Sequence, residues 1–305
     1  MTEERRLALI VNPSSGRGRG GKTLPDAERL LRDRGLSFRT VVSTDLGHGI
    51  ETALTAHEAG EVPVVMSGDG LVGQIGGTLA ERGATMGILP GGRGNDLARV
   101  LGIPSDLAGA ADVLAAGRTR EIDVGDANGR RFLCVASIGF ESVANERAND
   151  SRLLRGGLVY AYAGIRTLVS WKPARFDVTF DGRDRVEFDG YSVSIANSRA
   201  FGGGFFIAPS AELDDAAFDV VMVGKGSKLR FLTGMPEARK GTHVSRESVQ
   251  IRRAAEVEVG ADRPFAVYAD GEHLTDLPAK LRVLPAALRV LSPPGPLRGP
   301  DPSRD

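Results

Sequence analysis

Short apolar runs alternate with helical patterns in the part of the chain before Arg120. Runs of strand length occur at Leu7–Val11, Phe38–Ser43, Pro63–Met66 and Met86–Leu89, and helical patterns occur near Asp26–Arg34, Gly49–Ala59, Val72–Arg82 and Asp106–Ala116, the last with Gly117 as its stop. Strands that alternate with helices form parallel sheets covered on both faces. The pattern therefore predicts an α/β domain over residues 1–122.

The pattern changes after Arg120, where apolar runs follow one another with few helical segments between them. Strands are predicted at Arg131–Ala136, Phe176–Phe180, Tyr191–Ala196, Phe218–Val223, Val249–Arg252, Glu256–Val259, Phe265–Tyr268 and Leu281–Leu284. Asp-Gly turn signals separate several of them, and the best helical candidate is Leu153–Ser170. Residues 123–289 are thus predicted to be mostly antiparallel β-structure, as a sandwich or an open barrel.

Composition excludes several classes of protein. The 305 residues include 39 Lys and Arg and 39 Asp and Glu, so the net charge is zero. This balance argues against a nucleic-acid-binding face and against a strong polybasic membrane anchor. The single cysteine, Cys134, lies in an apolar run and is interpreted as a buried structural thiol, which fits a reducing cytoplasm. Neither a signal peptide nor a membrane-spanning run is present, so we expect a cytoplasmic protein with at most peripheral lipid contact.

Two glycine-rich turns, Ser67–Gly70 and Gly91–Gly94, each follow a predicted strand and precede a helix. In open α/β sheets, ligands bind at the carboxyl ends of the strands, and glycines let a phosphate approach the backbone N–H groups. The pattern predicts a nucleotide-phosphate site. A common Asp-Gly turn at Asp69 and ordinary helix capping by Asn95 and Asp96 are the alternatives.

A third loop, Asn12–Lys22, also lies between a strand and a helix. It lacks the Gly-Lys-Ser/Thr ending of a P-loop, but Ser14, Ser15 and Gly16 could offer N–H and O–H donors to a phosphate. A flexible turn with solvated arginines is the alternative. Three such loops at one sheet edge favour phosphate binding more than any one of them does.

Acidic groups in the second part have both a structural and a chemical interpretation. Asp270-Gly271-Glu272 is either a hairpin turn or a carboxylate general base brought to a cleft. The acidic stretch Glu212–Asp215 is either a solvated turn or an oxygen-rich site for magnesium or calcium. Gly202–Gly204 is interpreted as a tight bend or a substrate-facing loop. The four histidines lack zinc-ligand spacing, and no Gly-x-Ser-x-Gly elbow occurs.

Seven motifs in a fixed order extend over essentially the whole chain. They are NPSSG at 12–16, SGDG at 67–70, GILPGGRGNDLAR at 87–99, IDVG at 122–125, SIGFESVA at 137–144, ANSRAFGGGFFIAPSAELDD at 196–215 and DGE at 270–272. In this order they resemble the diacylglycerol kinase catalytic family, which includes soluble bacterial diacylglycerol kinases and sphingosine kinases.

The resemblance implies an NAD-kinase-like N-terminal α/β domain, a C-terminal β-sandwich and an active site in the cleft between them, with residues 290–305 returning to the first domain. It implies transfer of the ATP γ-phosphate to a lipid hydroxyl, with Mg²⁺. Carried over by motif, the ATP site consists of Asn12, Pro13, Ser14, Ser15, Gly16, Thr44, Ser67, Gly68, Asp69, Gly70, Gly94, Asn95 and Asp96. Glu272 is implied as the general base and Asp270 as its support; Asp215 is implied to bind magnesium with backbone carbonyls near Glu212 and Ala217.

Four residues depart from the family pattern, and all of them lie in the two glycine-rich turns or the helix start after the first. Leu71 replaces a threonine, Gly73 and Gln74 replace an Asn-Glu pair, and Arg93 replaces a second threonine. An arginine at position 93 could bind phosphate through two hydrogen bonds, or it could be solvated. Two other functions are therefore alternatives to a lipid kinase: a kinase for a soluble hydroxyl substrate, and a nucleotide- or lipid-binding regulator with little catalysis. An exposed sandwich edge could also pair into a homodimer.

Overall fold

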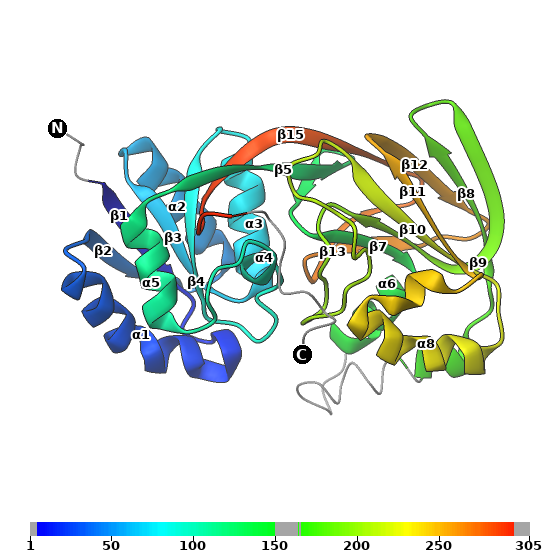
Figure 1. Cartoon of the computed structure of the whole chain (residues 1–305), viewed down its shortest axis with the longest axis horizontal. Coiled ribbons are helices and arrows are strands. Elements are labelled where there is room, and N and C mark those ends of the chain that lie inside the picture. Colours follow the sequence, from blue (N-terminus) through cyan, green and yellow to red (C-terminus); the bar gives the residue numbers. More distant parts are fainter. Residues whose placement is uncertain (1–4, 150–163, 165, 296–305) are drawn as a thin grey trace.

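The computed structural model describes residues 5–149, 164 and 166–295, which form two lobes (Figure 1). In the N-terminal lobe, four parallel strands are ordered β4-β3-β1-β2: β1 (Arg6–Val11), β2 (Ser37–Val42), β3 (Val62–Ser67) and β4 (Thr85–Pro90). Apart from their first positions, β1, β3 and β4 are buried, as expected for strands covered on both faces.

Helices cover both faces of this parallel sheet. They are α1 (Ser15–Asp33), α2 (Leu46–Glu58), α3 (Asp69–Ala80), α4 (Asp96–Val100) and α5 (Leu107–Ala116). Helix α5 packs against α1, while α2 packs against α3 on the other face (Figure 1). Gly117 ends α5 in the left-handed conformation, as predicted. The α/β character predicted from the apolar alternation is confirmed.

The C-terminal lobe is mostly antiparallel β-structure. Its strands are β5 (Thr119–Ala127), β6 (Arg130–Phe132), β7 (Val135–Gly139), β8 (Ala174–Phe180), β9 (Asp184–Ala196), β10 (Phe218–Gly224), β11 (Val249–Ala254), β12 (Glu256–Ala261), β13 (Ala266–Ala269), β14 (Glu272–Asp276) and β15 (Ala279–Leu291). Its helices include α6 (Phe140–Asn149), α8 (Lys228–Lys240) and the 3₁₀ turn Thr242–Ser245. Its own core includes the ring stack of Phe132 and Phe218.

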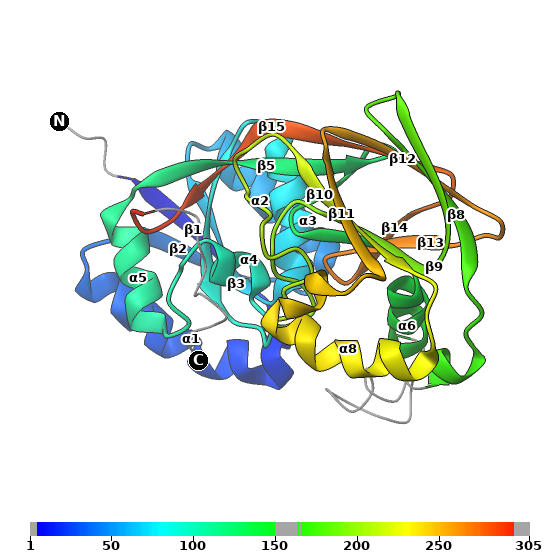
Figure 2. The ribbon, with the colours of Figure 1, turned by 45° about the vertical axis from the view of Figure 1, so that its right-hand side comes forward.

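Two long strands connect the lobes. β5 and β15 pair along most of their lengths, and both run from one lobe to the other in Figures 1 and 2. The end of β15 joins the parallel sheet, where Arg289 and Val290 pair with Thr85 and Met86 of β4. The sheet is therefore continuous across the two lobes. The boundary predicted at residue 122 falls within β5 and stays a prediction.

Several sequence-based bounds differ from the structure. The run Arg131–Ala136 is two strands, β6 and β7, with a break at Leu133 and Cys134. Helices α6 and α8 and strand β14 lack an apolar pattern strong enough to have predicted them. Of the predicted helix Leu153–Ser170, residues 153–163 and 165 lie outside the described residues, and residues 166–170 are helical.

Candidate active site

The two glycine-rich turns are held together by one carboxylate. Asp69, in the first turn of α3, accepts the backbone N–H of Asn95 at 2.9 Å and that of Asp96 at 2.6 Å. It thereby caps the start of α4. A Cβ on Gly92 would overlap the Cα of Gly68, so the turns pack backbone against backbone. Part of the glycine pattern therefore serves the contact between the loops themselves.

The loop at Asn12–Lys22 meets the same edge of the sheet. The backbone N–H of Asn12 donates to Met66 at the end of β3, and the Asn12 amide oxygen accepts the N–H of Ser14 at 3.0 Å. Ser15 begins α1 and is only 9% exposed, yet its hydroxyl has no hydrogen-bond partner among the described residues. A Cβ on Gly91 would lie 3.3 Å from that hydroxyl. A buried donor left open between two glycine-rich loops suits an incoming oxygen ligand.

Two of the other predicted nucleotide contacts lie at the surface. The Thr44 hydroxyl contacts Asp45 at 3.0 Å and His48 at 3.2 Å, just before α2. Arg93 is exposed. The structure leaves both side chains accessible from solvent.

Asp96 connects the N-terminal lobe to the C-terminal lobe. It is 5% exposed, and its carboxylate accepts the backbone N–H groups of Gly203 at 2.8 Å and Gly204 at 3.0 Å. Both glycines have positive φ, which orients consecutive N–H groups toward one oxygen pair. Burial, with the nearby charge of Asp69, raises the pKa of Asp96 to about 6. The Gly202–Gly204 bend thus binds a protein carboxylate, a contact that the sequence did not reveal.

Asp270 lies in the turn between β13 and β14, and Glu272 is the first residue of β14. Asp270 and Gly271 both have positive φ, as in a two-residue type I′ hairpin. The Asp270 carboxylate accepts the N–H of Leu133 at 2.7 Å and that of Cys134 at 3.1 Å, which accounts for the break between β6 and β7. Burial raises the pKa of Asp270 to about 6. Asp270 therefore fixes the turn in position.

The Glu272 carboxylate lies beside the first glycine-rich turn. A Cβ on Gly70 would be 3.5 Å from Glu272 Oε1, although the two residues are 202 positions apart in the chain. The Glu272 side chain is exposed, so it is open to a substrate. Asp270–Glu272 was interpreted either as a hairpin turn or as a general base brought to a cleft. Both interpretations are compatible with this geometry, because the hairpin places the Glu272 carboxylate beside the Ser67–Gly70 turn.

Two of the family departures have packing reasons. A Cβ on Gly73 would be 2.9 Å from the Cβ of Asp270, so this position has no space for a side chain. Leu71 is buried, and a Cβ on Gly49 of α2 would lie 3.0 Å from its methyl group. Cys134 is buried as predicted, and burial raises the pKa of its thiol. Nothing in the structure explains Gln74.

The acidic stretch near Asp215 forms a separate cluster. Asp215 accepts the N–H of Ala217 at 3.2 Å and forms an ion pair with Arg253, while Glu212 is exposed. Burial raises the pKa of Asp215, and the charges of Asp219 and Glu212 raise it further. No group of three or more His, Cys, Asp or Glu side chains is placed to hold a metal ion within the described residues. A site built from one carboxylate and backbone carbonyls, as predicted here, stays a prediction.

Two buried carboxylates near this cluster were not among the site residues predicted from the sequence. Asp219 accepts the Ser210 hydroxyl at 3.0 Å, and its other oxygen is buried without a hydrogen-bond partner. Asp123 accepts the N–H groups of Ala216 at 2.7 Å and Ala286 at 2.8 Å. Asp123 thus ties the acidic turn to β15. The position of Asp123 between Ile122 and Val124 was the available sequence signal.

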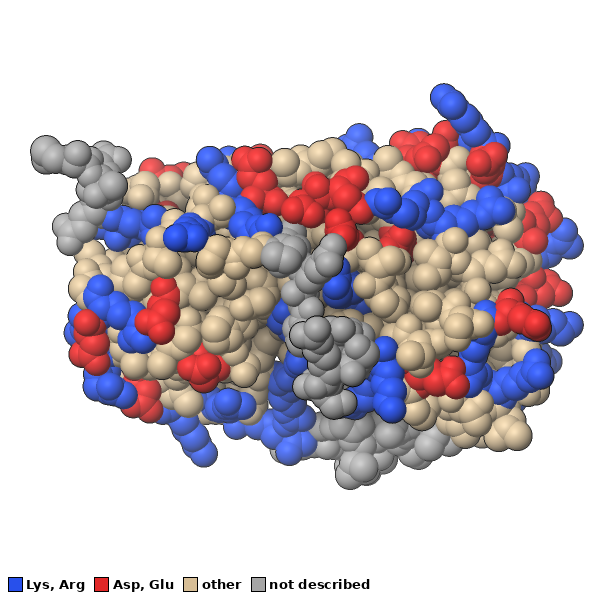
Figure 3. All heavy atoms as spheres, in the orientation of Figure 1, with Lys and Arg blue, Asp and Glu red and all other residues tan. Residues whose placement is uncertain are grey.

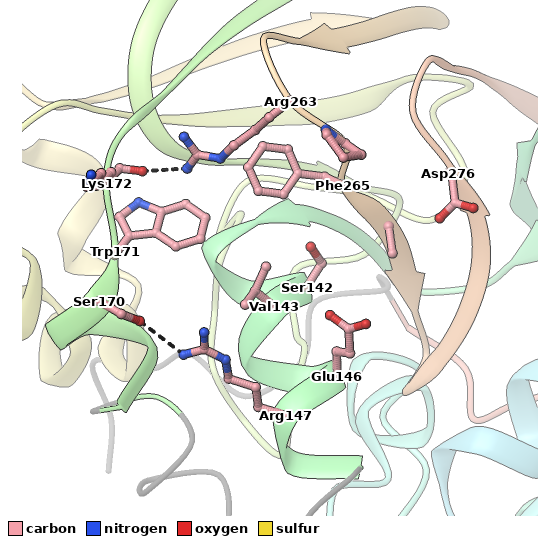
Figure 4. A pocket seen from close by; sticks show the side chains of 12 residues that line it. Ser142, Val143, Glu146, Arg147, Ser170, Trp171, Lys172, Arg263, Phe265 and Asp276 are labelled. Atoms are coloured by element: carbon pink, nitrogen blue, oxygen red, sulfur yellow. Dashed lines mark hydrogen bonds between the residues drawn. The ribbon is translucent and has the colours of Figure 1, made fainter.

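A cavity of about 660 Å³ lies in the C-terminal lobe, beside α6 and the far end of the β13–β14 hairpin (Figure 4). Trp171, Phe265 and Val143 provide apolar walls. Arg147 and Arg263 add positive charge; Arg263 stacks over Trp171 and Phe265 and donates to the carbonyl of Lys172. The cavity is therefore amphipathic.

The comparisons with known proteins agree with this architecture. The family "Diacylglycerol kinase catalytic domain" matches residues 6–127, and the "YegS C-terminal NAD kinase beta sandwich-like domain" matches residues 134–292. A diacylglycerol kinase of Mycobacterium tuberculosis is 35% identical over 94% of this chain and 95% of its own length. The chain belongs to the diacylglycerol kinase family.

More distant proteins match the chain over a similar extent. A diacylglycerol kinase of Staphylococcus aureus is 28% identical over 95% of this chain and 93% of its own length. A crystal structure of a diacylglycerol kinase from Bacillus anthracis has a TM-score of 0.74 at 20% identity, covering 96% of this chain and 99% of its own. An NAD kinase from Archaeoglobus fulgidus, solved with ATP, has a TM-score of 0.52 at 11% identity, covering 94% of this chain and 93% of its own. These likenesses confirm the two-part, NAD-kinase-like fold.

Proposed function

We propose that this kinase-family chain transfers the γ-phosphate of ATP to the hydroxyl of diacylglycerol or a similar lipid alcohol. The observation that carries the proposal is the position of the Glu272 carboxylate beside the Ser67–Gly70 turn, across the two lobes. Phosphoryl transfer needs positioned phosphates and a carboxylate that accepts the proton of the attacking hydroxyl.

In this proposal the N-terminal lobe holds the ATP phosphates. Asn12–Gly16, Ser67–Gly70 and Gly94–Asp96 surround one edge of the sheet, and the unpartnered Ser15 hydroxyl is available to a phosphate oxygen. Thr44 and Arg93 lie at the solvent-facing side and would contact the outer part of the nucleotide. The NAD kinase of the same fold was solved with ATP, which supports a nucleotide here.

The reaction then needs little from the protein beyond placement. Glu272 accepts the hydroxyl proton as the lipid oxygen bonds to the γ-phosphorus, the bond to the β-γ bridging oxygen breaks, and ADP leaves. Asp270 holds the turn through Leu133 and Cys134 and is a positioning residue. The amphipathic cavity beside α6 suits an amphiphilic acceptor better than a fully polar one.

Magnesium is proposed at Asp215, with backbone carbonyls near Glu212 and Ala217. Hard oxygen donors fit this ion, and the mutual repulsion of Asp215, Asp219 and Glu212 favours a cation beside them, a charge that Arg253 already supplies in part. When bound, the ion would neutralise carboxylate charge and hold the acidic turn beside Asp123.

Within the described residues, no helix is long and apolar enough to cross a membrane. We place the protein in the cytoplasm, in peripheral contact with a membrane while it phosphorylates its acceptor.

The test is incubation of the purified chain with γ-labelled ATP, magnesium and a panel of acceptors. The panel contains diacylglycerol and other lipid alcohols in mixed micelles, and NAD as a soluble acceptor. Label in a lipid phosphate supports the proposal. Label only in the NAD product would replace it with a soluble-substrate kinase, and tight ATP binding without any transfer would replace it with a regulator.

A further inference from the structure

Helix α8 carries an apolar face that nothing in the described structure covers. Leu229, Leu232 and Met235 are spaced three residues apart and are 70%, 44% and 39% exposed. Val169, which is 72% exposed, lies next to them. Its carbonyl accepts a hydrogen bond from the Lys228 ammonium at 2.6 Å. These four residues, here called the α8 apolar face, are four of the six large exposed hydrophobic side chains in the described part of the chain.

Aromatic contacts and caps explain why α8 is folded without burying this face. Phe231 packs its ring 4.4 Å from that of Tyr191 and 4.6 Å from that of Phe140, measured between centroids. Ser227 caps the first turn, and Gly241 ends the helix in the left-handed conformation. The α8 apolar face is therefore not needed to hold α8 in place.

Positive charge surrounds the α8 apolar face. Between Lys225 and Arg246 the sequence has six Lys and Arg residues and one acidic residue, Glu237, in a chain with 39 of each sign. Glu237 is neutralised by Arg246 at 2.6 Å, whereas Lys225 and Lys240 are exposed. In Figure 3, basic side chains lie along the lower edge of the C-terminal lobe, where Figure 1 places α8, with uncharged and some acidic surface between them.

An apolar stripe with a basic rim is the pattern of helices that lie in the plane of a membrane surface. Anionic lipid headgroups complement the charge, and acyl chains complement the leucines and methionine. From this complementarity we infer that the α8 apolar face and its basic rim dock the protein on an anionic lipid bilayer. The inference rests on the proposed function in that the acceptor is a membrane lipid.

The C-terminal end of α8 is joined to the candidate active site. The Arg239 guanidinium lies 5.8 Å from the centre of the Phe205 ring, and the N–H of Phe206 donates to Ala238 at 2.9 Å. The neighbouring Gly203 and Gly204 are the residues bound by Asp96. Docking through α8 therefore places the Gly202–Gly204 loop, and the junction between the lobes, at a fixed orientation to the bilayer.

The test is co-sedimentation of the full chain with vesicles in the absence of ATP. The vesicles are either phosphatidylcholine alone or phosphatidylcholine with phosphatidylglycerol. Leu232→Asp is compared with Val42→Asp, a matched control that is 47% exposed on the other lobe. We expect strong binding to anionic vesicles, about a tenfold loss for Leu232→Asp and no loss for Val42→Asp.

A second variant tests the charge independently of the apolar face. Lys225→Gln with Lys240→Gln should weaken binding to anionic vesicles by about fivefold for each charge, the equivalent of ~1 kcal/mol, and added salt should reproduce the effect. Equal binding of Leu232→Asp and Val42→Asp would overturn the inference. So would a loss of self-association in Leu232→Asp with vesicle binding intact, which would assign the face to a second copy of the chain.

The failure of this inference is distinguishable from that of the proposed kinase activity. Phosphorylation of a short-chain, monodisperse diacylglycerol without vesicles should be unchanged in Leu232→Asp, since α8 would not be needed there. If the wild-type chain phosphorylates no lipid but still binds anionic vesicles through α8, the kinase proposal fails alone. If it phosphorylates the short-chain acceptor but ignores anionic vesicles, the docking inference fails alone.

Discussion

Gly73 has no side chain because Asp270 of the other lobe occupies the space that one would need. The approach is close enough that even a Cβ would meet the Cβ of Asp270 at 2.9 Å. Since Asp270 in turn holds the N–H groups of Leu133 and Cys134, the contact at Gly73 bears on the position of the whole Asp270–Glu272 turn. The departure at position 73 is therefore a structural adaptation of this chain.

Gly73→Ala and Gly73→Asn should each lower phosphoryl transfer by about tenfold or more, because the added atoms displace Asp270 and with it Glu272. Overpacking should also cost about 1–3 kcal/mol of the free energy of unfolding, measured by urea denaturation. Gly226→Ala is the matched control, since a Cβ there meets no atom within 4 Å. Wild-type transfer by Gly73→Asn would contradict the packing explanation.

At the scale of single elements, the β13–β14 hairpin places the Glu272 carboxylate beside the Ser67–Gly70 turn. Asp270 and Gly271 form its two-residue turn, and Glu272 is the first residue of β14. A second Asp-Gly turn, at Asp181 and Gly182 between β8 and β9, has the same positive φ at both positions but lies away from the site. Comparing the same substitution in these two turns separates its effect on stability from its effect on catalysis.

Gly271→Ala and Gly182→Ala should each reduce the free energy of unfolding by about 1–2 kcal/mol, because alanine is strained at φ of 90° and 66°. Only Gly271→Ala should also lower the turnover number of the folded enzyme. Urea denaturation and steady-state kinetics on the same preparations provide both measurements. Equal turnover numbers in the two variants would show that the β13–β14 turn has no role in catalysis.

Elements with regular apolar patterns were predictable from the sequence, and polar elements were not. Strands β1, β3 and β4 are apolar runs between glycine and polar turns, and their ranges were predicted nearly in full. Helix α8 contains Gly234 and Pro236 and has no buried residue, so its sequence lacks a helical stripe facing a core. The break between β6 and β7 depends on Asp270, a contact over 136 residues that no local pattern encodes.

At the scale of the whole molecule, Asp96 joins the lobes from the N-terminal side and β15 joins them from the C-terminal side. The motifs of the candidate site were all visible in the sequence, but their roles were not. Asp69 and Asp96 were expected at a nucleotide, and the structure shows both holding backbone N–H groups of the protein. Side-chain partners across a lobe boundary depend on tertiary packing and cannot be derived from spacing.

Activity should fall as the pH decreases through about 6, because protonation of Asp96 and Asp270 weakens the hydrogen bonds that position the junction and the hairpin. The stability contribution of these carboxyls has the opposite sign. Their pKa values are raised from 3.8, so the folded chain binds more protons than the unfolded chain between pH 4 and 6, and this contribution grows as the pH falls.

The measurement is kcat/KM and thermal stability between pH 5 and 8, for wild type and Asp96→Asn. We expect the acid limb of wild-type activity without unfolding, and a lower, flatter profile for Asp96→Asn. A pH-independent rate down to pH 5 would show that neither carboxylate controls the site.

The most direct test of the account is the rate of phosphoryl transfer to lipid by Glu272→Gln, with ATP affinity measured on the same protein. Glu247→Gln, another exposed glutamate, is the control. Removal of the proposed general base should lower the rate by about 10²–10⁴-fold while leaving ATP affinity unchanged, since Gln keeps the shape of the side chain and the proposed phosphate contacts are made by other residues. Near wild-type transfer by Glu272→Gln would contradict the assignment of the base and with it the proposed mechanism.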